Sequence, residues 1–380
     1  MITSESGILT THAGSLPRPA ALAELHGRRS RGEDIDPAEL QAAVEAATAA
    51  SVAAQVEAGV DIGNDGEQAR ESFFTYVQHR MSGFGGASQR PLMRDLVDHP
   101  DFVELALPRF SRMKVNLMAA PAAISEVTYL DTTEVAQECD LVSVAPFAQT
   151  FMTAPSPGIV ASAMENRYYP SLEDYVRAVG QALRTEYRFI VDRGLLLQID
   201  APDLAMERHT LFADRPLGDF LAWVELVVDA INGSLVGIDP STVRLHVCWG
   251  NYEGPHTLDV PLEAILPLLY TAKVGALVIS MANARHAHEY KCFEARPLPE
   301  GMVLVAGVID TTSNYVEHAE VVADRLVRVA RAVGNPRRII AGTDCGFDTS
   351  AGLGDVAPSL VWEKLRALRA GADLATARLF

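Results

Sequence analysis

The chain has only four cysteines in 380 residues: Cys139, Cys248, Cys292 and Cys345. They are too few and too scattered for a disulfide framework, so we expect reduced thiols. No apolar run is long enough to cross a membrane, and residues 1–16 lack a signal-peptide pattern because polar residues and glycine interrupt them. The sequence therefore predicts a soluble, cytoplasmic protein.

A basic excess is also absent, because the formal net charge is −17. No basic patch could dominate such a field, which argues against nucleic acid or an anionic membrane as a partner. About half of the residues are apolar, enough for one large domain or two ordinary ones. We expect a single domain over residues 1–380, and a homo-oligomer is possible.

Apolar segments alternate with amphipathic ones along the chain. The predicted strands are residues 8–11, 60–64, 147–152, 195–200, 243–247, 276–280, 302–308 and 339–345. The predicted helices are residues 37–58, 172–193, 217–231, 261–269, 314–333 and 357–370. Residues 68–145 are irregular, and we interpret them as a long insertion with lid elements after the second strand.

Eight strands that alternate with helices indicate a (β/α)₈ TIM barrel. Most of these strands are continuously apolar, as expected when both faces are buried. A doubly wound sheet is disfavoured because no Gly-x-Gly-x-x-Gly turn follows the first strand. The sequence therefore predicts a barrel interrupted by the insertion.

Polar residues follow the predicted strands at their carboxyl ends, where barrel enzymes keep their chemistry. They are His12, Glu67, Asp200, His246, Cys248, Asp310 and Cys345. His246 and Cys248 lie two apart in one strand and therefore point the same way, and Cys345 ends another strand. One imidazole and two thiolates suit zinc better than magnesium or calcium. These three residues are the predicted Zn²⁺ ligands.

Several motifs in the same order resemble those of the cobalamin-independent methionine synthase family. They are Thr11-His12-Ala13-Gly14-Ser15-Leu16-Pro17-Arg18-Pro19, Gly66-Glu67, Ile199-Asp200-Ala201-Pro202, His246-Val247-Cys248-Trp249-Gly250-Asn251, Asn283-Ala284-Arg285-His286, Gly307-Val308-Ile309-Asp310 and Gly342-Thr343-Asp344-Cys345-Gly346. The resemblance covers nearly the whole chain, which corresponds to the family's catalytic barrel alone. It implies a zinc-bound thiolate that attacks an electrophilic carbon.

Two positions depart from the family pattern. Ser280 stands where the family usually adds a zinc-binding glutamate, and Thr312 stands where methionine synthases have a histidine thought to act as the acid. A methyl-folate reaction is therefore less favoured. The chain is similar to a subgroup with a His-x-Cys…Cys motif and a barrel-only length, the epoxyalkane:coenzyme M transferases (2-hydroxypropyl-coenzyme M lyases).

The resemblance also implies roles for other residues. Asp200 and Glu67 align with carboxylates that hold the amino group of homocysteine. Coenzyme M lacks an amino group, so they would instead orient a cation such as Arg18 or donate a proton to the opening epoxide. Arg18 and Arg70 are the candidates for a sulfonate, which a guanidinium binds in a forked geometry. His12 and Tyr252 are candidate proton donors. Ser15, Asn283 and Asp310 complete the predicted substrate site.

The predicted function is therefore zinc-dependent thiol alkylation, in which coenzyme M attacks an aliphatic epoxide. One alternative is methyl transfer to homocysteine or another thiol. A second alternative is a barrel that binds metal or thiol without catalysis, and Ser280 is the residue most consistent with it. A small thiol and a small electrophile are the expected partners.

Overall fold

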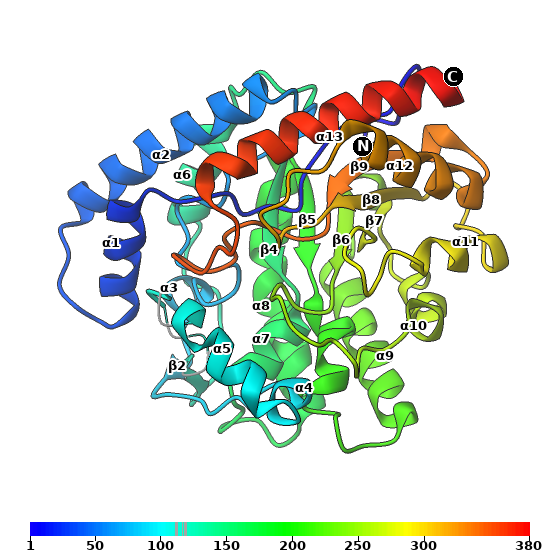
Figure 1. The fold of residues 1–380 in the computed structure, drawn as a ribbon. Helices are drawn as coiled ribbons and strands as arrows, with labels where there is room; N and C mark the ends of the chain where they lie inside the picture. The colour runs from blue at the N-terminus through cyan, green and yellow to red at the C-terminus, as the bar shows by residue number, and fades with distance from the viewer. Residues whose placement is uncertain (111–112, 116, 118–119) are drawn as a thin grey trace.

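The computed structural model describes residues 1–110, 113–115, 117 and 120–380, and a seven-stranded parallel sheet lies at its centre (Figure 1). The strands neighbour one another in chain order. They are β1 (Ile62–Gly63), β4 (Gln149–Pro155), β5 (Leu196–Asp200), β6 (Val243–Val247), β7 (Ala276–Ser280), β8 (Val303–Ile309) and β9 (Ile339–Thr343). This order confirms the predicted (β/α)₈-type fold.

The first predicted strand, residues 8–11, closes the sheet into a ring without forming a regular strand. Thr10 bridges Ala341 of β9, and Thr11 bridges Ile62 of β1, both in parallel. The amide of Thr11 donates to the carbonyl of Ala341 at 2.8 Å, and the amide of Ile62 donates to that of Thr10 at 3.0 Å. The carbonyl of Leu9 also accepts from the amide of Ala341, so the chain closes the barrel through the short segment 9–11.

The strands are buried on both faces, as their apolar sequences predict. Inside the ring, a small apolar cluster includes Ile62, Phe151, Val278 and Ile340. On the outside, the strands and the surrounding helices form the main core. This burial holds the strand ends rigidly, so that the side chains that follow them keep fixed positions.

Most of the predicted barrel helices lie close to their expected positions. They are α2 (Pro37–Glu57), α8 (Leu172–Asp192), α9 (Leu217–Ser234), α10 (Leu262–Leu269), α12 (Ala319–Val333) and α13 (Pro358–Leu379). In α2, Asp36 caps the amide of Ala38 and Pro37 occupies the first turn, as predicted. The prediction for α12 was wrong at its start, because His318 caps the amide of Glu320. The prediction for α13 ended too early.

Shorter helices complete the chain. They are α1 (Ala20–Ser30), which the sequence did not predict, α7 (Pro157–Ala163), α11 (Cys292–Ala295) and the 3₁₀ turns at Pro202–Leu204, Met206–His209, Pro240–Thr242, Glu289–Lys291 and Pro336–Arg338. None of the described helices is long and apolar enough to cross a membrane.

Residues 68–145, which lie between β1 and β4 in the chain, form several short helices and strands. These elements are α3 (Val77–Arg80), β2 (Phe84–Gly85), α4 (Arg94–Val97), α5 (Pro100–Phe110), β3 (Ala122–Ala123) and α6 (Thr133–Val142). Strands β2 and β3 pair in antiparallel orientation. The elements α3, α4, α5 and β2 gather on one side of the barrel (cyan in Figure 1).

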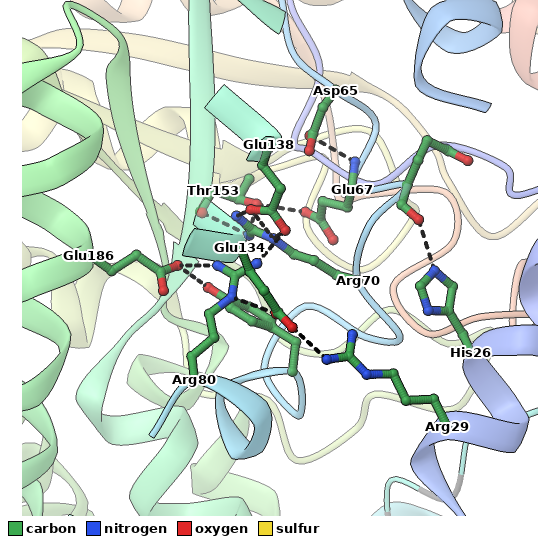
Figure 2. A network of polar contacts seen from close by, with 12 residues as sticks. His26, Arg29, Asp65, Glu67, Arg70, Arg80, Glu134, Glu138, Thr153 and Glu186 are labelled. Atoms are coloured by element: carbon green, nitrogen blue, oxygen red, sulfur yellow. Dashed lines mark hydrogen bonds and ion pairs between the residues drawn. The ribbon is translucent and has the colours of Figure 1, made fainter. Parts of the chain in front are cut away.

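A buried ionic network anchors this segment to the barrel (Figure 2). Glu138 of α6 accepts hydrogen bonds from Arg70 at 2.8 Å and also from Arg80. The Nη1 atom of Arg80 lies 3.2 Å from the carboxylate of Glu186 in α8. Arg70 donates to the carbonyl of Thr153 in β4 at 2.8 Å. The two arginines and two glutamates are almost fully buried, so each needs its partners.

Candidate metal and substrate site

His246, Cys248 and Cys345 meet at the carboxyl ends of two strands of the barrel. His246 lies within β6, Cys248 follows it directly, and Cys345 follows β9. One ligand atom from each residue lies within 4.8 Å of the other two, and all three residues are buried. The structure therefore brings together the three predicted metal ligands.

The donor atoms of this group fit a tetrahedral zinc ion. The Nδ1 atom of His246 lies 3.3 Å from the carbonyl of Val278, to which it can donate, whereas its buried Nε2 atom has no partner. The two sulfur atoms are 4.0 Å apart. With zinc–sulfur bonds of about 2.3 Å, two tetrahedral ligands lie about 3.8 Å apart. A free imidazole nitrogen and two suitably spaced sulfurs therefore form a candidate metal centre.

The two thiols also influence each other. The hydrogen bond from Cys345 lowers the pKa of Cys248 well below its usual range. The same contact, together with burial, raises the pKa of Cys345 well above its usual range. The pair therefore holds one thiolate readily, and a bound cation would favour the second.

A cavity of about 380 Å³ opens next to the three residues. Its polar wall near the cysteines carries Glu67 and Asp200. Its remaining wall is mostly apolar and includes Phe73, Phe74, Pro91, Leu92, Met93, Leu96, Val103, Leu107, Met113, Leu117, Met206 and Leu353. Most of these apolar residues belong to the segment 68–145, so this segment supplies one side of the cavity.

Glu67 is held in an unusual backbone conformation at this wall. Its φ of +57° lies in the left-handed region, which non-glycine residues rarely adopt. Its Oε1 atom accepts from Thr153 at 3.1 Å, whereas its Oε2 atom is buried without a partner. Gly14 is required opposite, because a Cβ atom there would lie 2.5 Å from Oε1.

Burial makes both carboxyl groups at the cavity weak acids. Burial, followed by the neighbouring charge of Asp200, raises the pKa of Glu67 to about 8. Burial likewise raises the pKa of Asp200 to about 6, although Gln198 donates to it at 2.7 Å. Ionising a buried carboxyl group costs free energy. A cationic group of a ligand would offset this cost by pairing with the carboxylates.

The two arginines predicted to bind a sulfonate have other partners. The guanidinium of Arg18 pairs with Asp348 at 3.1 Å and donates to the carbonyl of Glu67 at 2.9 Å. Arg70 is held by Glu138 and Thr153, and neither arginine is in the cavity wall. Neither guanidinium is therefore positioned to receive a sulfonate in this structure.

His12 and Tyr252, the candidate proton donors, have different surroundings. His12 lies outside the cavity wall; its Nδ1 accepts from the amide of Gly14 and its Nε2 contacts Gln55 at 2.9 Å. Burial lowers the pKa of His12 to about 4, so that it is neutral and a poor acid. Tyr252 does line the cavity, and its hydroxyl donates to Asp95 at 2.6 Å.

The other predicted substrate residues divide between two cavities. Ser15 lines the large one. Asn283 and Asp310 line a second cavity of about 220 Å³, which shares Cys248, Tyr252 and Cys345 with the first. The predicted residues therefore lie on both sides of the two cysteines.

Ser280 also lines the second cavity, beside Cys248 and Cys345. Its hydroxyl donates to the carbonyl of Asp344 at 2.6 Å. Glu289, a conceivable replacement ligand, instead accepts from the amide of Leu262 and lies in neither cavity wall. Ser280 therefore lies near the candidate metal ligands, and its correspondence to the family's glutamate stays a prediction.

Two features of the site were not found from the sequence. The carboxylate of Asp344 accepts the amides of Met281, Ala282 and Asn283, each at 2.8 Å, and so ties the loop after β7 to the end of β9. The sequence shows that Asp344 precedes Cys345, but it does not show that the loop after β7 bonds to this carboxylate. The second feature is a group of histidines around Asp259, which no spacing rule predicts.

The parallel barrel carries a histidine–cysteine group that could hold a metal ion at the carboxyl ends of its strands. The family described as the cobalamin-independent synthase catalytic domain matches residues 113–360. The chain therefore belongs to this family of methionine synthase-like transferases, and the resemblance of the motifs is confirmed.

Individual relatives are distant. The methionine synthase of Saccharolobus solfataricus is 25% identical over 340 residues, which cover 89% of this chain and 87% of that protein. The 2-hydroxypropyl-CoM lyase of Xanthobacter autotrophicus is 24% identical over 214 residues, which are 50% of this chain and 53% of the lyase. Both relatives are similar to this chain, but at such identities neither determines its substrate.

Solved structures share the fold. A B12-independent methionine synthase from Shewanella sp. W3-18-1, in complex with selenomethionine, superposes with a TM-score of 0.73 at 20% identity and covers 98% of both chains. A putative vitamin-B12 independent methionine synthase from Listeria monocytogenes gives a TM-score of 0.63 at 16% identity, over 96% of this chain and 98% of that chain.

Proposed function

We propose that this protein transfers a methyl or other small alkyl group to the sulfur of a small amino thiol such as homocysteine. One observation carries the proposal: Glu67, which has a buried carboxylate oxygen without a partner, lines the same cavity as Asp200, His246 and the two cysteines. Two carboxyl groups next to a sulfur-binding centre suit a molecule with an ammonium group and a thiol.

Zinc is the cofactor that the donor set fits. His246, Cys248 and Cys345 would hold it, and three protein ligands leave one position open. When bound, zinc keeps a thiol deprotonated at neutral pH. The buried hydrogen bond from Nδ1 of His246 to Val278 would keep Nε2 directed at the metal.

The charges around the cavity favour an amino thiol over coenzyme M. Among the described residues of the large cavity, Arg90 is the only basic side chain apart from His246, and its guanidinium pairs with Glu207 at 2.5 Å. A sulfonate there would face Glu67 and Asp200 without a free cation. An ammonium group, by contrast, would complete the hydrogen bonds that Glu67 lacks.

The apolar wall supports a donor that is itself largely apolar. Side chains such as Leu96 and Met206 would desolvate the reacting carbon and exclude water. A donor with several carboxylates would find few cations there. The transferred group would therefore come from a small or apolar electrophile.

The role of the carboxylates can be tested with Glu67→Gln. We expect the KM for homocysteine to rise about ten- to hundred-fold, since a charge-assisted hydrogen bond contributes roughly 1.5–3 kcal/mol. Propanethiol, which has no amino group, should keep its KM within about two-fold of wild type on the same rough scale. Steady-state kinetics with both thiols and one alkyl donor measure this. Equal losses with both thiols would show that Glu67 does not bind the amino group.

Coenzyme M and an epoxide remain a second candidate pair, because the apolar cavity would accept a short epoxide and one relative is a 2-hydroxypropyl-CoM lyase. Product formation from coenzyme M and epoxypropane, compared with product formation from homocysteine and a methyl donor, distinguishes the two candidate substrate pairs. Turnover of either pair would exclude the third possibility, a barrel that binds thiols without catalysis.

Ser280→Glu should strengthen zinc binding, because it restores the carboxylate that the family usually places there. Ser280 shares a cavity with Cys248 and Cys345, so a longer acidic side chain would lie beside the metal ligands. Without zinc, a buried carboxylate costs stability. We therefore expect zinc to raise the Tm more in this variant than in wild type or in the matched control Ser280→Gln. An equal zinc-dependent rise in all three proteins would contradict the assignment.

A further inference from the structure

Three histidines surround Asp259 beside the second cavity. The Nδ1 atom of His256 and the Nε2 atom of His286 lie 2.9 and 2.8 Å from the same carboxylate oxygen, Oδ2. The Nδ1 atom of His209 lies 2.9 Å from the other oxygen, Oδ1. These residues come from the turn after β5, the loop after β6 and the loop after β7, so only the folded barrel assembles them.

The contact between His256 and Asp259 needs a positive charge. The Nε2 atom of His256 lies 3.1 Å from the carbonyl of Tyr252, which can only accept, so a hydrogen on Nε2 satisfies this contact. In a neutral ring the Nδ1 atom then has a lone pair that faces a carboxylate oxygen at 2.9 Å. Two acceptors are stable at this distance only with a proton or a metal ion between or beside them.

His209, the third histidine of the group, also has a ring nitrogen without a partner. It is fully buried; its Nδ1 atom faces Oδ1 of Asp259 at 2.9 Å outside hydrogen-bond geometry, and its Nε2 atom has no partner. Unpaired buried polar atoms are rare and costly.

We propose that His256, Asp259 and His286 form a second metal site, for a divalent transition-metal ion such as Zn²⁺ or Co²⁺. One ligand atom from each lies within 4.8 Å of the others. Neighbouring ligand atoms around an octahedral ion with bonds of about 2.1 Å are about 3.0 Å apart. Two imidazoles and one carboxylate leave further positions open. His256 and His286 line the second cavity, from which an ion could enter.

The site is distinct from the cysteine centre and can be tested without it. In the double variant Cys248→Ser/Cys345→Ser, we expect calorimetric titration with Zn²⁺ to show about one bound ion per chain. Adding His256→Ala or Asp259→Asn should weaken this binding by more than about 100-fold, because loss of a ligand exceeds the 10- to 100-fold effect of an outer partner. Co²⁺ should give ligand-field bands without thiolate-to-cobalt charge transfer.

A matched control is His288→Ala, which removes an exposed histidine two residues from His286 and should leave binding unchanged. If the double variant does not fold, the number of Zn²⁺ ions bound by the wild-type chain tests the site. Two ions per chain in wild type and one in His256→Ala would support it. No ion in the folded double variant, or one ion in both wild type and His256→Ala, would overturn it and leave a proton as the shared cation. Neither outcome depends on the transfer activity proposed above.

Discussion

Replacing Cys248 or Cys345 by serine is expected to lower the zinc content by about one ion per chain and to abolish alkyl transfer. Changes to residues that merely support a zinc ligand weaken metal binding about 10- to 100-fold, so loss of a sulfur ligand should exceed that range. A serine hydroxyl is a poor replacement because it stays protonated at neutral pH. Metal analysis after dialysis against a chelator measures the occupancy, and product formation measures the activity.

Cys292→Ser provides the control for this experiment. Cys292 is a half-buried thiol whose nearest polar contact is Glu289 at 3.5 Å, and it lies in neither cavity wall. Its loss should change neither zinc content nor turnover. Full zinc occupancy in both Cys248→Ser and Cys345→Ser would show that the sulfurs do not bind the metal.

Glu138→Gln should lower the free energy of unfolding by about 3–5 kcal/mol, the typical cost of removing one partner from a buried ion pair. Glu138 lies between two guanidiniums, those of Arg70 and Arg80, and all three side chains are at most 3% exposed (Figure 2). Without the carboxylate, two buried cations lose their shared counter-ion. Urea denaturation followed by circular dichroism measures the difference.

A second variant tests whether burial causes this effect. Glu134 also contacts Arg80, at 3.3 Å, but its side chain is 38% exposed. Glu134→Gln should therefore cost less than about 1 kcal/mol, as exposed ion pairs do. Similar losses in both variants would mean that the buried network is no more important than a surface pair.

The stability contributed by Glu138 should also depend on pH. Burial alone would raise its pKa, but Arg70 and Arg80 lower it from 4.5 to about 2. A group whose pKa is lowered by folding stabilises the protein above its unfolded pKa and loses that contribution as pH falls toward the folded value. The wild-type advantage over Glu138→Gln, about 3 kcal/mol on this basis, should shrink between pH 4.5 and 2. A constant difference across this range would contradict the assignment.

The sequence by itself determined most strands of the barrel and the class of the fold. Strands β5 to β9 were predicted close to their observed bounds, because apolar runs and, in β6, the alternation of Val243, Leu245 and Val247 are local signals of buried strands. The pairing of His246 with Cys248 was equally local, since residues two apart in a strand share a face. The motif order then indicated the family, which the comparison over residues 113–360 confirms.

The weaker predictions concerned segments whose structure depends on distant partners. Residues 8–11 were predicted as an ordinary strand, but they form isolated bridges to β1 and β9 only at Thr10 and Thr11. Helix α1 was missed, because it begins at Ala20 without a side-chain cap. No local pattern marks either feature.

Only the tertiary structure decided which charged side chains are already paired within the protein and which could bind a ligand. Arg18 and Arg70 follow strand ends, as substrate-binding arginines do, yet Asp348 and Glu138, from distant parts of the chain, pair with them. Glu67, in contrast, lines the cavity and has a carboxylate oxygen without a partner. Strand spacing is set by neighbouring residues, whereas the partner of a buried charge comes from whichever segment packs against it, and that packing is a property of the whole fold.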